Sequence, residues 1–378
     1  MTHEPCSSLS IENLGGYKMV SKENTYKGAS LFGAPLAQST GNRLLAKALR
    51  KAMTGRASFT VEQAVRIFCM QFVLAPVAYA LPKKLAVQIG HALALVLLIL
   101  PRSGLRVYWQ MRNAFGKGRI ESLYLAWGWL ATQFIDVVII KRLSYGREDL
   151  SKWKIIERNV DRINSLRESG EPYIVVHGHF LQISSLGMSS PNVTYGQPVV
   201  INDPVLKRVQ SLYELRLRID DRTYHKAYPR WGRDWVWVYN NELSAARKLY
   251  RRLHERGNVV FIPVDKPWRE NSYGAYARPF AGKKKCVFST GAAALARLAR
   301  CPIISCVPVL ERDGTIVVEW GEPIRIVGED EANDLKVMDE LLDALEIGVG
   351  ERPTQYKFEI GGDRRWNPRS RRWEDLTE

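Results

Sequence analysis

The stretch Tyr173-Ile-Val-Val-His-Gly-His-Phe180 (YIVVHGHF) decides the fold. Residues 173–176 are a short run of β-branched and aromatic side chains, with the length and composition of a buried strand. Further strands are predicted at residues 198–201, 258–262, 301–308 and 315–320, with helices at 205–218, 242–256 and 290–300. Strands that alternate with helices indicate βαβ units. The sequence therefore predicts an α/β fold with a largely parallel central sheet flanked by helices.

The two histidines that follow the first strand are the first candidate site. In sheets of this kind, ligands bind where the strands end and the loops begin, and His179 occupies such a position. Imidazole suits acid–base chemistry because its ordinary pKa lies near working pH. His177 is interpreted as a structural histidine at the strand end. The sequence contains no GxGxxG motif, no Walker loop and no internal repeat.

Length and composition set the domain organisation. The chain has 378 residues, of which 46% are hydrophobic, enough for one α/β core with extensions. We expect a polar and flexible arm at 1–60, a helical membrane-associating region at 61–150, the α/β core at 151–366 and a basic tail at 367–378. The five cysteines are scattered, with no CxxC pair and no metal-ligand spacing. They predict a reducing compartment, no disulfide framework and no bound metal.

The charge of the chain indicates a polyanionic partner. The formal net charge is +16 at pH 7. An anionic membrane surface, a nucleic acid and an acidic carrier protein all fit such a charge. Several basic residues lie beside apolar segments, which favours the membrane surface. They are Arg102, Arg106, Arg112, Lys117, Arg119, Lys141 and Arg142.

Two apolar stretches, 67–81 and 85–100, support the same interpretation. Each is shorter than the roughly 20 residues that a spanning helix needs. They are expected to form a helical pair that lies in the membrane interface, or an ordinary pair of core helices. A single tilted span is possible if flanking residues are included. Residues 105–143 are expected to form further amphipathic helices, with Trp127 and Trp129 at an interface or in the core.

Seven short segments follow one another along the chain in a defined order and spacing. They are residues 107–116, 179–181, 262–265, 278–282, 289–297, 352–356 and 364–366. Taken together, these segments resemble the late lipid A acyltransferases, the lauroyl- and myristoyl-transferase family of Gram-negative inner membranes within the lysophospholipid acyltransferase-like superfamily. The resemblance covers roughly residues 65–366.

The resemblance implies an activity and a location. It implies transfer of an acyl group from acyl carrier protein or coenzyme A to a lipid or small-molecule acceptor, with no cofactor. It implies a protein at the cytoplasmic face of the inner membrane, either peripheral or with a single span. It also implies that His179 is the general base within a signature of His, four residues, then Asp or Glu. In this chain Ser184 occupies the acid position.

This departure leaves three interpretations open. His179 works alone or with a carboxylate from elsewhere, such as Asp203 or Asp265. Alternatively, the acceptor is a more reactive group, such as an amine or hydroxylamine, that needs less help from a base. The donor could then differ too, for example an aminoacyl ester on RNA, which the positive charge would accommodate. In the third interpretation the chain is a catalytically silent homologue that binds lipid or a partner. Serine accepts a hydrogen bond from imidazole but carries no charge.

Further candidate residues bind substrate if the resemblance holds. Arg216 and Arg218 are expected to bind an anionic head group, or to face solvent on a helix. The lysines at 283–285 could meet phosphates or an acidic carrier, or form a solvated patch. Asp203 has helix capping as its alternative role. Four more substrate-binding candidates lie in the later blocks, where capping is the alternative for the threonine. They are Phe280, Gly282, Thr290 and Gly291.

Overall fold

The computed structural model describes ten segments of the chain, all within one compact unit that spans Ala48–Glu378. The segments are residues 68–69, 73–99, 104–149, 152–180, 193–199, 234–239, 243–265, 274–311, 313–328 and 330–376. The arm expected at 1–60 and the helix expected at 205–218 lie outside these described residues.

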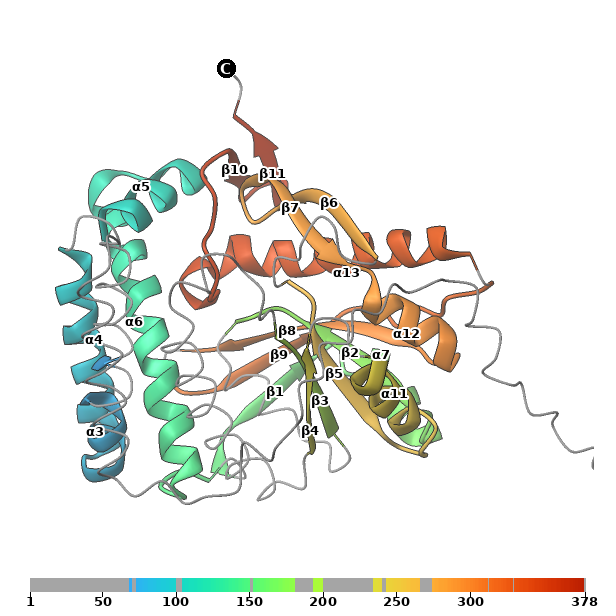
Figure 1. Ribbon diagram of the computed structural model, residues 1–378. Helices are drawn as coiled ribbons and strands as arrows, with labels where there is room; N and C mark the ends of the chain where they lie inside the picture. Colours follow the sequence, from blue (N-terminus) through green and yellow to red (C-terminus); the bar gives the residue numbers. More distant parts are fainter. Residues whose placement is uncertain are drawn as a thin grey trace, which may run out of the picture. The chain divides into compact units, whose positions relative to one another are not determined.

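A seven-stranded mixed sheet forms the centre of the unit (Figure 1). Its order is β1-β9-β8-β2-β5-β3-β4, and β8 with β9 is the one antiparallel pair in it. The predicted α/β fold with a largely parallel sheet is therefore confirmed. The strands are β1 (Ile155–Arg158), β2 (Tyr173–His177), β3 (Val193–Val199), β4 (Asp234–Tyr239), β5 (Val259–Pro263), β8 (Ile303–Leu310) and β9 (Ile316–Trp320).

Sequence analysis missed two strands of this sheet, β1 and β4, and both lie at its edges. β1 and β4 each have one neighbouring strand. Along β1 the side chains alternate between half-buried and exposed, so the strand lacks the continuous apolar run that marks a central strand such as β2. β3 begins at Val193, five residues before the predicted start at 198.

Apolar side chains of β2 alternate between two cores, one on each face of the sheet. Tyr173 and Val175 pack with helix α7 (Asp161–Ser169), whereas Ile174 and Val176 belong to the larger core on the other face. The larger core includes side chains of α11 (Leu243–Arg252), α12 (Gly291–Ala299) and α13 (Glu331–Glu351), together with side chains of the helices that precede the sheet in sequence. β2 and β5 are parallel neighbours, so both strands end at the carboxyl edge of the sheet, between these two cores.

A layer of four helices precedes the sheet in sequence (Figure 1). The helices are α3 (Leu74–Ala80), α4 (Lys83–Leu98), α5 (Gly104–Phe115) and α6 (Arg119–Ser144). The two expected apolar helices are α3 and α4, with Pro82 between them as predicted. Arg142, near the end of α6, closes that turn because its guanidinium donates to the carbonyls of Ala78 and Leu81 at 3.0 and 2.6 Å.

Helix α6 is the one helix of the described residues that is long and apolar enough to cross a membrane. However, 61% of its most apolar window is buried inside the protein. Its buried side chains include the polar residues Gln133, Asp136 and Lys141. Polar side chains of this kind need protein partners, so the middle of α6 is built to face the rest of the molecule.

Two hairpins and a 3-10 turn complete the described structure. β6 (Ala275–Phe280) pairs with β7 (Lys283–Ser289), β10 (Arg364–Asn367) pairs with β11 (Arg372–Asp375), and the turn η5 spans Pro353–Gln355. Gly282, between β6 and β7, has φ +78°, and a Cβ there would lie 2.5 Å from the carbonyl oxygen of Gly361. A glycine is therefore required where the hairpin meets the C-terminal segment. The core was expected to end at residue 366, but Trp366 of β10 pairs with Trp373 of β11, so the strand pairing continues beyond that boundary.

Candidate functional site

His179 and Asp265 form a hydrogen-bonded pair at the carboxyl edge of the sheet. β2 and β5 are parallel neighbours, with His177 in register with Pro263. Each of the two residues comes two positions after the end of its strand, so the register brings them together. Oδ1 of Asp265 lies 2.5 Å from Nδ1 of His179, and Oδ2 accepts the backbone N–H of His179 at 2.6 Å.

Burial differs sharply between the two partners. The side chain of Asp265 has no exposed surface, whereas 17% of the His179 side chain is exposed. A buried carboxylate requires hydrogen-bond donors, and here both of its oxygens accept from His179. An acceptor on Nδ1 selects the tautomer with the proton on that nitrogen, so Nε2 carries the lone pair. The pair thus presents a basic imidazole nitrogen that a carboxylate orients.

The glycine between the two histidines makes this close approach possible. A Cβ at Gly178 would lie 2.7 Å from the ring of Phe180 and 3.3 Å from Oδ2 of Asp265. The first of these distances is shorter than real Cβ contacts allow. Any larger residue at this position would therefore displace the Phe180 ring or widen the bond to Asp265.

A segment that follows η5 lies against the pair. The backbone N–H of Lys357 donates to the His179 carbonyl at 2.7 Å. The ring of Phe358 lies 4.6 Å from the imidazole, centroid to centroid. The Tyr356 hydroxyl is hydrogen-bonded to Asp265. Sequence analysis placed Tyr356 in a family block but gave it no role, and Lys357 and Phe358 carry no signal of their own.

Helix α6 packs on the far side of this segment. The Gln133 amide donates to the carbonyl of Lys357 at 3.3 Å, and the Lys357 ammonium forms an ion pair with Asp136. The side chains of Asp136 and Lys357 are 4% and 17% exposed. Lys357 therefore connects the helical layer to the His179–Asp265 pair, because it contacts both.

His177 has a different environment, which agrees with the structural role expected for it. Its side chain is buried against Phe261, and Nδ1 lies 3.0 Å from the carbonyl oxygen of Gly178. Burial lowers the pKa of His177 to about 4, which keeps the ring neutral near pH 7. This histidine helps to fix the strand end that carries His179.

The remaining predicted site residues divide into two groups. Ser184, Asp203, Arg216 and Arg218 lie outside the described residues. In the second group, Phe280 is buried, and its ring centroid lies 6.3 Å from that of Tyr356, which connects it indirectly to the pair. Gly282 lies against the C-terminal segment, as described above.

Thr290 and Gly291 lie at the start of α12. Thr290 is the N-cap residue but makes no side-chain capping bond. Instead, Ser289 Oγ accepts the amide hydrogen of Gly291 at 3.1 Å. Thr290 therefore occupies the N-cap position that one alternative gave it, but the side chain of the preceding serine, and not its own, satisfies the amide hydrogen of Gly291.

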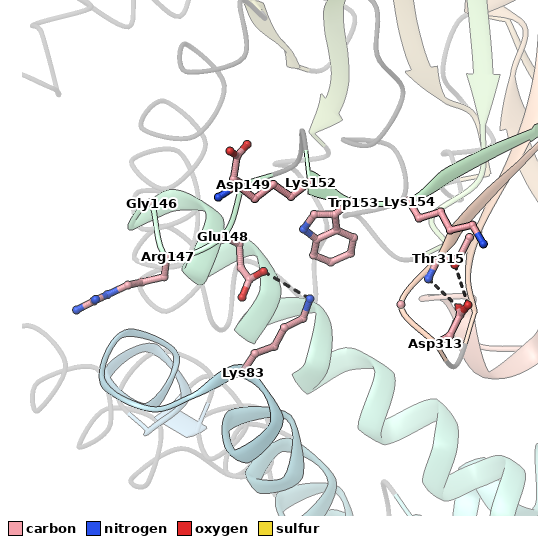
Figure 2. Close-up of a pocket in the computed structure, with 11 residues that line it drawn as sticks. Lys83, Gly146, Arg147, Glu148, Asp149, Lys152, Trp153, Lys154, Asp313 and Thr315 are labelled. Atoms are coloured by element: carbon pink, nitrogen blue, oxygen red, sulfur yellow. Dashed lines mark hydrogen bonds and ion pairs between the residues drawn. The ribbon is translucent and has the colours of Figure 1, made fainter.

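A polar pocket of about 540 Å³ lies elsewhere on the same unit (Figure 2). It is formed by the start of α4, the loop between α6 and β1, and the turn between β8 and β9. Figure 2 shows the Lys83 ammonium beside Glu148, 3.5 Å away, and it also lies 4.0 Å from the Trp153 ring. The Asp313 carboxylate accepts hydrogen bonds from the backbone N–H and the hydroxyl of Thr315, both at 2.9 Å. Neither His179 nor Asp265 lines this pocket.

Within the described segments, no group of three or more His, Cys, Asp or Glu side chains is placed to hold a metal ion. A scan against protein-family models and a search of the curated proteins found no match to this chain. The chemistry of the His179–Asp265 pair therefore has to be argued from its own geometry.

Proposed function

We propose that the chain is an acyltransferase related to the late lipid A acyltransferases. It moves an acyl group from a thioester of acyl carrier protein or coenzyme A to a hydroxyl or amine of a lipid or other acceptor. The observation that carries the proposal is the 2.5 Å contact between Nδ1 of His179 and the buried carboxylate of Asp265. A general-base histidine needs an anion that holds one of its ring nitrogens, which Asp265 does for Nδ1, and the proposal assigns the role of base to Nε2.

In this proposal the reaction proceeds in two steps. Nε2 of His179 takes the proton of the acceptor as its oxygen or nitrogen attacks the thioester carbonyl, which gives a tetrahedral intermediate. The carbon–sulfur bond then breaks, and the imidazolium returns the proton to the departing thiolate. Asp265 stabilises the imidazolium between these steps. The products are an ester or amide and a free thiol, so no cofactor is required.

Asp265 supplies the charge that Ser184 lacks. Of the three interpretations of the missing acid, the pair favours the first, in which a carboxylate from elsewhere supports His179. The carboxylate comes from the end of the neighbouring strand, 86 positions along the chain.

We further propose that the protein works at an anionic membrane surface, at the end of the helical layer where α5 lies. Large apolar side chains are exposed there at the end of α4, on α5 and at the start of α6. They are Leu95, Val96, Ile99, Leu105, Trp109, Ile120, Leu123 and Tyr124. Exposed apolar side chains gathered in this way are typical of an interaction surface.

Basic side chains flank this apolar surface. Arg112 lies over the Trp109 ring, 5.1 Å from its centroid. Lys117, in the turn between α5 and α6, and Arg119, the first residue of α6, are both exposed. Arg365 of β10 lies against Gly116 in the same turn. Cations beside apolar side chains favour anionic lipid head groups. We favour peripheral seating over a spanning α6, because Gln133, Asp136 and Arg142 bond to other parts of the protein.

The proposal is tested by incubating the purified protein with lauroyl-coenzyme A or lauroyl-acyl carrier protein and a bacterial lipid extract. We expect an acylated lipid in the mass spectrum and release of one thiol per product. His179→Ala is expected to remove both signals while the protein stays folded. Full activity of this variant would refute the role of His179. The RNA-borne donor is tested separately by treating a cell lysate with ribonuclease, and product that survives this treatment rules that donor out.

A further inference from the structure

The segment Gln355–Phe358 is fixed to the sheet on both sides of Tyr356. The Gln355 amide clamps the end of β8, because it donates to the Leu310 carbonyl at 2.7 Å and accepts the Leu310 N–H at 2.9 Å. On the other side, the Lys357 N–H donates to the His179 carbonyl at 2.7 Å. Because the residues on both sides of Tyr356 are held, the backbone at this position is fixed and the Tyr356 side chain lies in the protein interior.

The Tyr356 side chain is completely enclosed by aromatic rings. Its ring centroid lies 5.7, 5.9 and 6.3 Å from those of Phe180, Phe358 and Phe280, and 2% of the residue is exposed. Within this apolar surrounding its hydroxyl is hydrogen-bonded to Asp265. Burial, together with the charge of Asp265, holds the pKa of Tyr356 well above its usual range. The hydroxyl therefore stays protonated, and remains a donor, near neutral pH.

Asp265 consequently accepts from three donors: the backbone N–H of His179, its Nδ1–H and the Tyr356 hydroxyl. The three donors together restrain the carboxylate more than the two donors of His179 do alone. They also divide its negative charge, so that the anion attracts the imidazolium less strongly than it would alone.

We propose that Tyr356 is a positioning residue that acts on the reaction through Asp265. It orients the carboxylate toward Nδ1 of His179 and limits how tightly the imidazolium is held. The proposal rests on the proposed function, because it assigns the residue that tunes its general base. Tyr356 does not touch the substrate in this account, so its effect appears in the rate and pH dependence and not in thioester binding.

The competing explanation is that Tyr356 only fills space among the phenylalanines. Tyr356→Phe separates the two, since it keeps the ring and removes the hydroxyl. Tyr276→Phe is a matched control. Tyr276 packs beside Phe288, and its buried hydroxyl has no hydrogen-bond partner among the described residues. Tyr276→Phe therefore removes the same hydroxyl oxygen as Tyr356→Phe but breaks no hydrogen bond to a described residue.

The first measurement is the pH dependence of acyl transfer from lauroyl-coenzyme A. We expect Tyr356→Phe to lower kcat/KM about tenfold near pH 7, the loss typical of one hydrogen bond to a charged group. The midpoint of the acidic limb should move to higher pH, because a carboxylate with one donor fewer holds the imidazolium more tightly. The KM for the thioester should not change, and Tyr276→Phe should match the wild type throughout.

The second measurement does not depend on activity. The Nδ1 proton of a histidine bonded to a carboxylate gives a low-field proton NMR signal, which His179→Gln would identify by its loss. We expect Tyr356→Phe to shift this signal and Tyr276→Phe to leave it in place. A pH profile that is the same in Tyr356→Phe and wild type overturns the proposal, whether or not the signal moves. If the wild type transfers no acyl group, the proposed function fails, and an unshifted signal would then show that the hydroxyl does not act on the pair either.

Discussion

Replacing Asp265 by asparagine tests the pair with almost no change in shape. The two oxygens of Asp265 accept donors at 2.5 and 2.6 Å, and an amide has one oxygen to offer both. If the amide NH₂ faces the backbone N–H of His179, two donors collide at 2.6 Å. If it faces Nδ1, the imidazole must carry its proton on Nε2, where it cannot act as a base. Both arrangements remove the productive tautomer and the charge that stabilises the imidazolium.

The size of the effect follows from this geometry. In the serine-protease triad, the corresponding loss of charge and tautomer lowers kcat about 10⁴-fold, which is about 5 kcal/mol of transition-state stabilisation. The side chain of Asp265 is fully buried, so solvent does not compensate for the loss. We therefore expect kcat to fall by about 10³- to 10⁴-fold, with a smaller change in KM.

The assay is steady-state release of thiol from lauroyl-coenzyme A with a lipid acceptor. The matched control is Asp334→Asn, which removes a carboxylate that is similarly buried and paired with Arg297 by two 3.0 Å bonds. Asp334 lies about 20 Å along α13 from Gly348, whose backbone packs beside Phe180. This control should lose about 3 kcal/mol of stability but keep its kcat. If Asp265→Asn retained kcat within about tenfold of wild type, the carboxylate would not support the base.

Two further predictions concern stability and membrane binding. The pKa of His177 is about 4 in the fold, below the ordinary value near 6.5, so the unfolded state takes up this proton first as the pH falls. Acidification from pH 6.5 to 4 should therefore lower the free energy of unfolding by about 3 kcal/mol in the wild type but not in His177→Asn. The measurement is urea unfolding at several pH values, and the same loss of stability with acidification in both proteins would contradict this. Lys117→Gln and Arg119→Gln should each weaken binding to vesicles with 30% anionic lipid about fivefold, whereas Lys336→Gln, an exposed lysine on α13, should not. Equal losses in all three variants would mean that only net charge matters.

Much of the central sheet was predictable because buried parallel strands have a strong local signal. β2, β5, β8 and β9 are all runs of β-branched residues, and His179 and Asp265 each follow such a run. Both residues could therefore be proposed separately as strand-end groups. Asp265 could be named, beside Asp203, as a possible partner of His179. The sequence could not choose between them, since the choice depends on β5 lying next to β2, and β3 comes between these strands in sequence but not in the sheet.

The rest of the candidate site carries too little local information. Tyr356 is an aromatic residue among other aromatics, and its hydroxyl acquires a role only when α13 and η5 return the chain to the sheet edge. The hairpin of β6 and β7 was missed because its second strand begins with three lysines, which suggest a solvated patch. The resemblance to a family motif drew attention to Ser184, whereas the anion comes from a different part of the fold.

A double-variant cycle on His179 and Asp265 tests the central claim most directly. Single and double variants, His179→Ala, Asp265→Asn and both together, are compared in kcat for acyl transfer from lauroyl-coenzyme A. Residues that act as one unit are non-additive, so the double variant should be no slower than His179→Ala alone. If the two losses multiplied instead, Asp265 would act independently of His179, and the proposed general-base pair would be wrong.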